Sequence, residues 1–217
     1  MKKKVLLVGG GGREHALAWK IIQSSLVEKL YIAPGNAGMK NVGEVVPIKA
    51  TDITGLLKFA QEKKIDLTFV GSDDPLALGI VDEFQKAGLR IFGPTKAAAQ
   101  IEASKAFAKE FMAKHNIPTA EFKVFTSLEP AKKYVQEKGV PIVIKASGLA
   151  LGKGVYVCKS VEEAEKALEE MFVNKVFGEA GNEVVIEEFL DGQEISIHAL
   201  SDGKNFYILP PAQDHKT

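Results

Sequence analysis

The first part of the chain alternates short apolar runs with segments of helical spacing, and this alternation constrains the fold more than any other feature. The runs are rich in Val, Leu and Ile and are bounded by Gly or Pro, which is typical of strands. Alternation of strand and helix predicts a parallel sheet with helices on both faces, an α/β doubly wound fold. We expect strands at residues 4–8, 29–33, 65–70 and 90–92, and helices at 14–24, 54–63 and 75–87.

The rest of the chain predicts a different kind of unit. An alanine-rich helix is expected at residues 95–115, and Pro118 favours a boundary near residues 118–122. A small α+β unit follows, and two more strands at residues 194–200 and 205–209 begin something new. We therefore expect domains at 1–120, 121–193 and 194–217, with the last one truncated, so that the chain is a fragment of a longer protein. The α+β unit is expected to contain helices at 128–138 and 161–172 and a last strand at 183–189.

Composition excludes several classes of protein. The 217 residues carry a formal net charge of +0, which gives no basic field for nucleic acid. The single cysteine, Cys158, excludes a disulfide framework and favours a cytoplasmic protein. No apolar run approaches the roughly 18 residues that a membrane span needs. We expect neither nucleic acid nor membrane as a partner.

A glycine-rich loop at residues 146–154 lies between two runs that resemble strands. It contains Gly148, Gly152 and Gly154, with Lys145 and Lys153 beside them. Glycines let backbone N–H groups approach an anion, and lysines suit phosphate oxygens. The spacing does not fit a P-loop, which needs four residues between its glycines and a helix after them. The loop predicts a phosphate-covering hairpin, and an ordinary hairpin with surface lysines is the alternative.

A second glycine run, residues 9–12, lies between the first strand and the first helix. This is the phosphate-binding position of a doubly wound sheet. It is a poor dinucleotide fingerprint, because Glu14 or His15 occupies the place of the third glycine. A smaller phosphorylated ligand, held by the loop and Arg13, fits better. Glycine and polar residues at 34–38 and 71–75 end two more strands at the same edge, although turn formation alone explains such residues.

Two glutamates, Glu187 and Glu188, end an apolar run that predicts a buried strand. Burying a carboxylate is costly, so these residues need a reason. Recognition of an adenine amino group and ribose hydroxyls is one reason, and a solvated turn is the other. Lys105, taken alone, is typical of a surface residue in a lysine-rich helix.

These motifs occur together and in order, and with them the chain resembles the phosphoribosylamine–glycine ligases (glycinamide ribonucleotide synthetases), ATP-grasp enzymes of purine biosynthesis. The resemblance covers the whole chain. It rests on residues 9–17, 33–38, 92–99, 104–109, 144–155, 187–192 and 211–216.

The resemblance implies a preATP-grasp domain, then a small ATP-grasp lid, then the first strands of a central ATP-grasp unit. It implies that ATP, glycine and 5-phosphoribosylamine give glycinamide ribonucleotide, ADP and phosphate through a glycyl phosphate, in a monomeric full-length enzyme. The implied ATP-binding residues are Lys105, Lys145, Gly148, Gly152, Lys153, Gly154, Glu187, Glu188, Phe189, Leu190 and Glu194. The implied catalytic residues are Lys145, Lys153, Asp214 and Lys216. The implied phosphoribosylamine site comprises Gly10, Gly11, Gly12, Arg13, Glu14, His15, Asn36, Gly38 and Asp73.

The chain departs from the family pattern at two positions. Asp73 follows Gly71-Ser72 where the family usually has Gly-Pro-Glu, and Thr217 stands where Arg is common. The ligands of a Mg²⁺ or Mn²⁺ ion are expected beyond residue 217, so no metal ligand is named in this chain and the chain alone is expected to be inactive. A different ATP-grasp ligase and a non-catalytic nucleotide-binding module are the alternatives.

Overall fold

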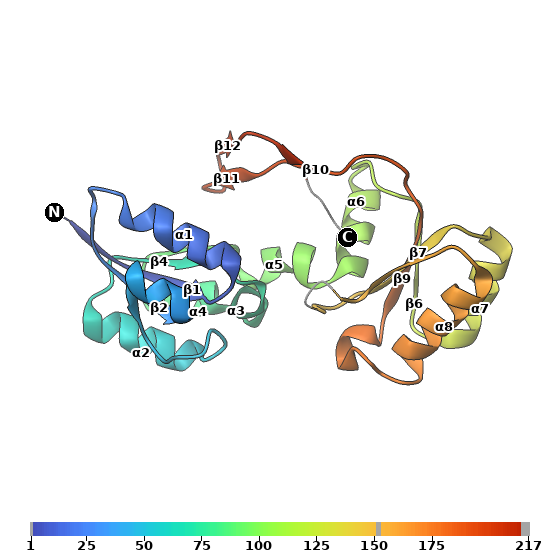
Figure 1. Cartoon of the computed structure of the whole chain (residues 1–217), viewed down its shortest axis with the longest axis horizontal. Helices are drawn as coiled ribbons and strands as arrows, with labels where there is room; N and C mark the ends of the chain where they lie inside the picture. The colour runs from blue at the N-terminus through green and yellow to red at the C-terminus, as the bar shows by residue number, and fades with distance from the viewer. Residues whose placement is uncertain (1, 151–152, 214–217) are drawn as a thin grey trace.

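The structure is a computed structural model that describes residues 2–150 and 153–213. Figure 1 shows a sheet formed by the N-terminal part, a second sheet formed by the later part, and helix α5 running between them. The first part comprises β1 (Lys3–Gly9), α1 (Gly12–Ile22), β2 (Val27–Pro34), the 3₁₀ helix η1 (Ala37–Asn41), β3 (Glu44–Val45), α2 (Ile53–Lys63), β4 (Leu67–Val70), α3 (Asp73–Leu78), α4 (Ile80–Lys86) and β5 (Ile91–Phe92).

The first sheet is parallel throughout and has the order β3-β2-β1-β4-β5. Alternate residues of β1 point to its two faces. Leu6 and Val8 pack with α2 and α4 in one core, while Leu7 packs with Ala18 of α1 in another. Figure 1 shows α1 on one side of this sheet and α2 and α4 on the other. The doubly wound prediction is therefore confirmed, and the strand order reverses between β1 and β4, where such sheets form a ligand crevice.

Two helices that the sequence predicts as continuous are interrupted. The helix expected at 75–87 is divided into α3 and α4 by Gly79, whose φ of +94° is left-handed. The helix expected at 95–115 is divided into α5 (Lys96–Ala103) and α6 (Lys105–Lys114) by Ser104. The backbone of Ser104 is extended, and its hydroxyl accepts a hydrogen bond from the backbone N–H of Phe107. A helix N-cap thus stands where an uninterrupted helix was predicted.

The second sheet is antiparallel, with the order β6-β9-β7-β8. Helices α7 and α8, whose bounds equal the predicted ones, cover one of its faces, where Ile144, Leu168 and Ile186 are fully buried. Helix α6 contacts β9 from the other face. The elements are β6 (Phe122–Phe125), α7 (Leu128–Lys138), β7 (Ile142–Ala146), β8 (Val155–Cys158), α8 (Val161–Phe172), the 3₁₀ helix η2 (Gly178–Gly181) and β9 (Val184–Glu188).

The last described segment forms shorter strands than predicted. β11 (Ala199–Ser201) and β12 (Phe206–Ile208) make an antiparallel hairpin, and β10 (Ile195–Ser196) pairs with β13 (Ala212–Gln213). Nearly all side chains of this segment are exposed. Its assignment to a third domain stays a prediction. Among the described residues, no helix is both long and apolar enough to cross a membrane.

Candidate functional site

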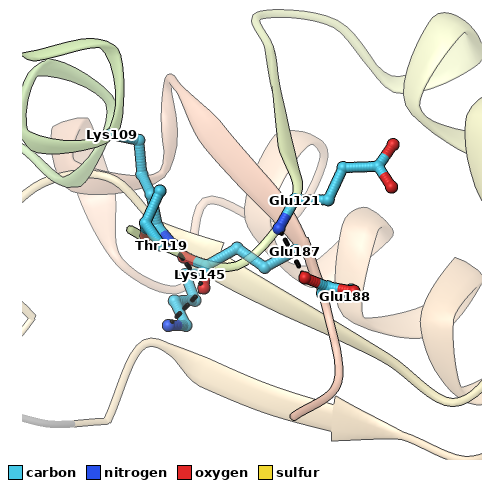
Figure 2. Close-up of polar contacts among 6 residues, drawn as sticks. All are labelled: Lys109, Thr119, Glu121, Lys145, Glu187 and Glu188. Carbon is cyan, nitrogen blue, oxygen red and sulfur yellow. Dashed lines mark hydrogen bonds and ion pairs between the residues drawn. The ribbon is translucent and has the colours of Figure 1, made fainter. Parts of the chain in front are cut away.

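Two charged side chains project from the face of the second sheet that α7 and α8 leave open. Lys145 of β7 pairs in register with Val185 of β9, two residues from Glu187, so both side chains lie on the same face. Lys145 Nζ lies 2.9 Å from Glu187 Oε2. Figure 2 shows Lys109 of α6 approaching the same carboxylate, and its Nζ lies 3.0 Å from the same oxygen. Helix α6 and the open face of the sheet therefore share a lysine–glutamate–lysine cluster.

The other oxygen of Glu187 is an unpaired acceptor. Glu187 Oε1 is buried and has no hydrogen-bond partner among the described residues. A buried carboxylate oxygen without a donor is costly in a folded protein. The atom is therefore available to an N–H or O–H donor of a ligand, as the sequence predicts for an adenine amino group.

A third lysine reaches the glycine loop. Lys105 Nζ donates to the carbonyl oxygen of Gly148, 3.2 Å away. Burial lowers the pKa of Lys105 below its ordinary value, and the charge of Lys145 adds to this, whereas Glu102 and Glu187 act in the opposite direction. Lys105, predicted from the resemblance and unremarkable in the sequence, is thus part of the same positive cluster as Lys145.

The start of the glycine loop is tied down on both sides. The Ser147 hydroxyl donates to Glu183 Oε2 at 3.0 Å and accepts from the backbone N–H of Ala106 at 3.1 Å. The Ser147 carbonyl accepts from the backbone N–H of Lys105 at 2.8 Å. Since Phe107 donates to Ser104, all three N–H groups at the start of α6 are satisfied by protein atoms. The first turn of α6 and the loop form one unit.

Packing explains two of the loop glycines. A Cβ on Gly148 would lie 2.7 Å from the Cα of Ala180, and one on Gly154 would lie 2.8 Å from the Cβ of Ala150. Other residues of the same chain approach too closely at both positions for a side chain to fit. Glycine is therefore required there whether or not a ligand also approaches. Lys153 is exposed, and Gly152 lies outside the described residues.

The two glutamates at the end of β9 point in different directions (Figure 2). The Glu188 carboxylate accepts a hydrogen bond from the backbone N–H of Glu121 at 2.8 Å, before β6. Only Glu187 belongs to the lysine cluster. Phe189, Leu190 and Glu194 follow as exposed residues, so their predicted contacts with adenine and ribose stay predictions.

The carboxyl ends of β1, β2 and β4 bring the predicted sugar-phosphate residues together. A Cβ on Gly10 would lie 2.6 Å from the carbonyl oxygen of Gly35, and the Gly10 carbonyl accepts from Asn36 Nδ2 at 2.9 Å. Arg13 reaches from α1 to Asp73, with Nη1 and Oδ1 3.5 Å apart. This edge of the sheet is the crevice position that the strand order defines.

The remaining residues of this edge divide into structural and available groups. Glu14 is buried, and its Oε2 accepts from the backbone N–H of Gly11 at 2.7 Å, as in a capping box. His15 lies beside Gly38, since a Cβ there would be 2.9 Å from His15 Cε1. Gly12 is open, because a Cβ on it would meet nothing within 4 Å. Glu14 therefore shapes the loop, while Gly12 leaves room for a ligand.

Two residues of the site were not predicted from the sequence, and two further predicted residues lie outside the described part of the chain. Lys109 and Ser147 were not predicted, although Lys109 stands four residues after Lys105 and hence on the same side of α6. Asp214 and Lys216 lie outside the described residues. Within residues 2–150 and 153–213, no three His, Cys, Asp or Glu side chains form a group that could hold a metal ion.

Comparison with known proteins agrees with this architecture. Residues 3–102 match the family model described as phosphoribosylglycinamide synthetase, N domain, and residues 103–217 match the one described as phosphoribosylglycinamide synthetase, ATP-grasp (A) domain. The chain is 58% identical over 214 residues to the phosphoribosylamine–glycine ligase of Haemophilus influenzae and 57% identical over 215 residues to that of Escherichia coli strain K12. In both cases 98% of this chain and 50% of the relative are covered.

Solved structures show the same fold. The crystal structure of phosphoribosylamine–glycine ligase from Thermotoga maritima matches with a TM-score of 0.77 and 32% identity, over 96% of this chain and 49% of that one. The biotin carboxylase domain of a Hydrogenobacter thermophilus 2-oxoglutarate carboxylase, in complex with MgADP, matches with a TM-score of 0.77 at 19% identity, over 98% of this chain and 50% of that one. At that identity the second match shows the fold alone.

The fold and the lysine-lined site define a protein of the ATP-grasp class. Within that class, the chain belongs to the phosphoribosylglycinamide synthetase family. It spans about half the length of the curated relatives it matches.

Proposed function

We propose that the protein is an ATP-dependent ligase that joins glycine to 5-phosphoribosylamine in purine biosynthesis, releasing ADP and phosphate. The observation that carries the proposal is that Lys105 contacts the glycine loop at Gly148, while Lys145, beside the same loop, contacts the Glu187 carboxylate, which has an unpaired oxygen. The names of the relatives, at 58% and 57% identity, support the choice of substrates. A cytoplasmic, monomeric enzyme is part of the proposal.

The reaction has two steps. An oxygen of the glycine carboxylate attacks the γ-phosphorus of ATP, the bond to the bridging oxygen breaks, and ADP leaves. The nitrogen of phosphoribosylamine then attacks the carbonyl carbon of glycyl phosphate, phosphate leaves, and the nitrogen loses a proton. Neither step needs an oxidant or reductant, so positioning and neutralisation of phosphate charge are the main tasks of the protein.

Residues of this chain have distinct tasks in the proposal. Lys105 and Lys145 neutralise phosphate oxygens of ATP, while the Gly148 loop covers them. Lys153, in the exposed part of the loop, adds a third positive charge for the phosphates. Glu187 Oε1 accepts a hydrogen bond from the adenine amino group. Asp214 and Lys216 are expected to approach the substrates. No step is assigned to a metal ion, because the described residues contain no suitable ligand group.

The sugar phosphate is proposed to bind where β1, β2 and β4 end. The phosphate faces the glycine run and Arg13, where helix α1 begins and its N–H groups favour an anion. Asn36, His15 and Gly38 border the same crevice. Asp73, already paired with Arg13, orients that guanidinium.

Release of ADP tests the proposal. The intact native protein is given ATP with glycine and phosphoribosylamine, and ADP is measured with each substrate omitted in turn. We expect release that depends on glycine and on phosphoribosylamine. ADP release with bicarbonate in place of glycine would instead identify a carboxylase of the same class, and ATP binding without turnover would favour a nucleotide-binding module.

A further inference from the structure

One oxygen of Glu187 serves two lysines. Glu187 Oε2 lies 2.9 Å from Lys145 Nζ and 3.0 Å from Lys109 Nζ (Figure 2). The side chain of Glu187 is 6% exposed, that of Lys109 is 10% exposed, and that of Lys145 is 27% exposed. A single negative charge thus faces two positive charges, one buried with it and one at the open side.

The two lysines differ in how firmly they are held. Lys109 Nζ also donates to Thr119 Oγ1 at 2.7 Å and lies 5.7 Å from the centre of the Phe122 ring. Its backbone belongs to α6, and the first turn of α6 is hydrogen-bonded to the start of the glycine loop. For Lys145, the one side-chain hydrogen bond within the described residues is the one to Glu187. Lys109 is therefore fixed by several groups, and Lys145 by one.

A lysine that binds phosphate must leave its partner. If Lys145 turned toward a triphosphate and Glu187 had no other cation, a buried carboxylate would be stranded, which is strongly unfavourable. A second, fixed cation removes that penalty. Two cations on one carboxylate also leave an excess positive charge in the cluster, which suits an incoming polyanion.

We propose that Lys109 is the permanent counter-ion of Glu187 and a positioning residue that frees Lys145 for the phosphate groups of the nucleotide. The inference rests on the proposed function, because it takes ATP as the ligand of Lys145. Lys109 itself touches neither nucleotide nor substrate. In its absence Glu187 holds Lys145 and withholds it from the phosphates.

A purely structural role for Lys109 has a different signature. If Lys109 only joined α6 to β9, its loss would lower stability and weaken adenosine and ATP alike. The proposed role affects phosphates alone. The decisive quantity is therefore the ratio of two dissociation constants, that of adenosine divided by that of ATP.

The experiment measures both constants by calorimetry in the intact native protein. The variants are Lys109→Met, Glu187→Gln, the double variant Lys109→Met/Glu187→Gln, and Lys132→Met as a matched control. Lys132 also pairs with a glutamate, 2.7 Å from Glu169, in a more exposed ion pair between α7 and α8 on the opposite face of the sheet. Melting temperatures are recorded for all variants.

We expect Lys109→Met to lower the ratio by about ten- to a hundredfold, the range for one lost charged contact. The double variant should recover the ratio to within about threefold of the wild type, because a neutral glutamine no longer retains Lys145 and removing both charges avoids a stranded one. Lys132→Met should leave the ratio unchanged.

The outcomes separate the two proposals. A wild-type protein that binds no ATP would overturn the proposed function and this inference with it. A wild type that binds ATP, with equal losses of ATP and adenosine affinity in Lys109→Met, would overturn the inference alone. If Lys109→Met does not fold, the double variant decides, and a ratio tenfold or more below the wild type would overturn the role of Lys109.

Discussion

Lys105 donates from Nζ to the carbonyl oxygen of Gly148 at 3.2 Å, across 43 residues of sequence. The bond joins the beginning of α6 to the glycine loop at the point where the loop leaves β7. An ammonium group that is partly buried here sits beside the charge of Lys145, and its pKa is lowered chiefly by burial. A cation of α6 is therefore already directed at the backbone of the loop.

Replacing Lys145 by alanine should weaken ATP binding by about ten- to a hundredfold and slow turnover, because one charge-assisted contact to phosphate is lost. Lys133→Ala is the control, since Lys133 is an exposed lysine of α7 that pairs with Glu137 one turn away. Calorimetric titration with ATP measures both. Equal effects of the two substitutions would refute the role of Lys145.

Lys105 should titrate at a lower pH than an ordinary lysine. Its pKa is lowered in the folded protein, so its ammonium loses the proton as pH rises before an exposed lysine does. Competitive acylation, read by mass spectrometry across a pH series, should place the midpoint for Lys105 below 10.5, the ordinary pKa of a lysine. ATP should raise the midpoint, because phosphate favours the charged form. A midpoint at or above 10.5 would contradict the expectation.

Gly148→Ala should destabilise the protein by roughly 1–3 kcal/mol, the usual cost of overpacking. The added Cβ would lie 2.7 Å from the Cα of Ala180, a backbone atom that cannot rotate away. Gly12→Ala is the control, because its Cβ would meet nothing within 4 Å. Chemical denaturation of both variants gives the comparison. If Gly148→Ala left the free energy of unfolding unchanged, η2, which contains Ala180, would have to move aside easily.

The N-terminal crevice should bind a sugar phosphate and not NADH. Its glycine run lacks the third glycine of a dinucleotide fingerprint, with Glu14 turned inward to cap the loop. Ribose 5-phosphate should raise the melting temperature, and Arg13→Ala should remove most of that increase. Titration with NADH should give no saturable change in fluorescence. Micromolar binding of NADH would falsify the assignment.

Stability should fall at alkaline pH through Tyr156. Its hydroxyl donates to Glu170 Oε2 at 2.6 Å, and this hydrogen bond, followed by burial, raises its pKa to about 12. Because the folded-state value lies above the ordinary 10, the stabilisation is complete below pH 10 and is lost as pH rises from 10 to about 12. Phenolate absorbance measures the titration. Tyr156→Phe should cost about 1 kcal/mol at neutral pH and abolish this part of the pH dependence.

Sequence patterns predicted the elements best where local signals agree. Helices α7 and α8 have the expected bounds because clear apolar spacing coincides with a serine N-cap and, for α7, with Gly139 after the last residue. Alternating strands and helices were sufficient for the parallel sheet. The break at Gly79 had a visible signal, since glycine interrupts helices, whereas the break at Ser104 depends on a partner from distant sequence, Ser147.

The candidate site was predicted mainly through the resemblance and less through local pattern. Lys105 is indistinguishable from a surface lysine until Gly148 is placed beside it. Lys109 was missed because its partners, Thr119 and Glu187, are distant or unremarkable in sequence. β10 and most of β11 lie within the single strand predicted at 194–200, and β12 lies within the one predicted at 205–209, whereas β13 was not predicted. The strands are short because no covering layer among the described residues extends their pairing.

The bonds between Ser147 and the first turn of α6 have a mechanical consequence. Every N–H group at that end of the helix already bonds to Ser147 or Ser104, so the first turn of α6 is fixed to the start of the loop. We therefore expect α6 to move as a rigid body with the start of the glycine loop when a ligand binds. Lys109 lies in the second turn of α6, so such a movement would also displace the cation that pairs with Glu187.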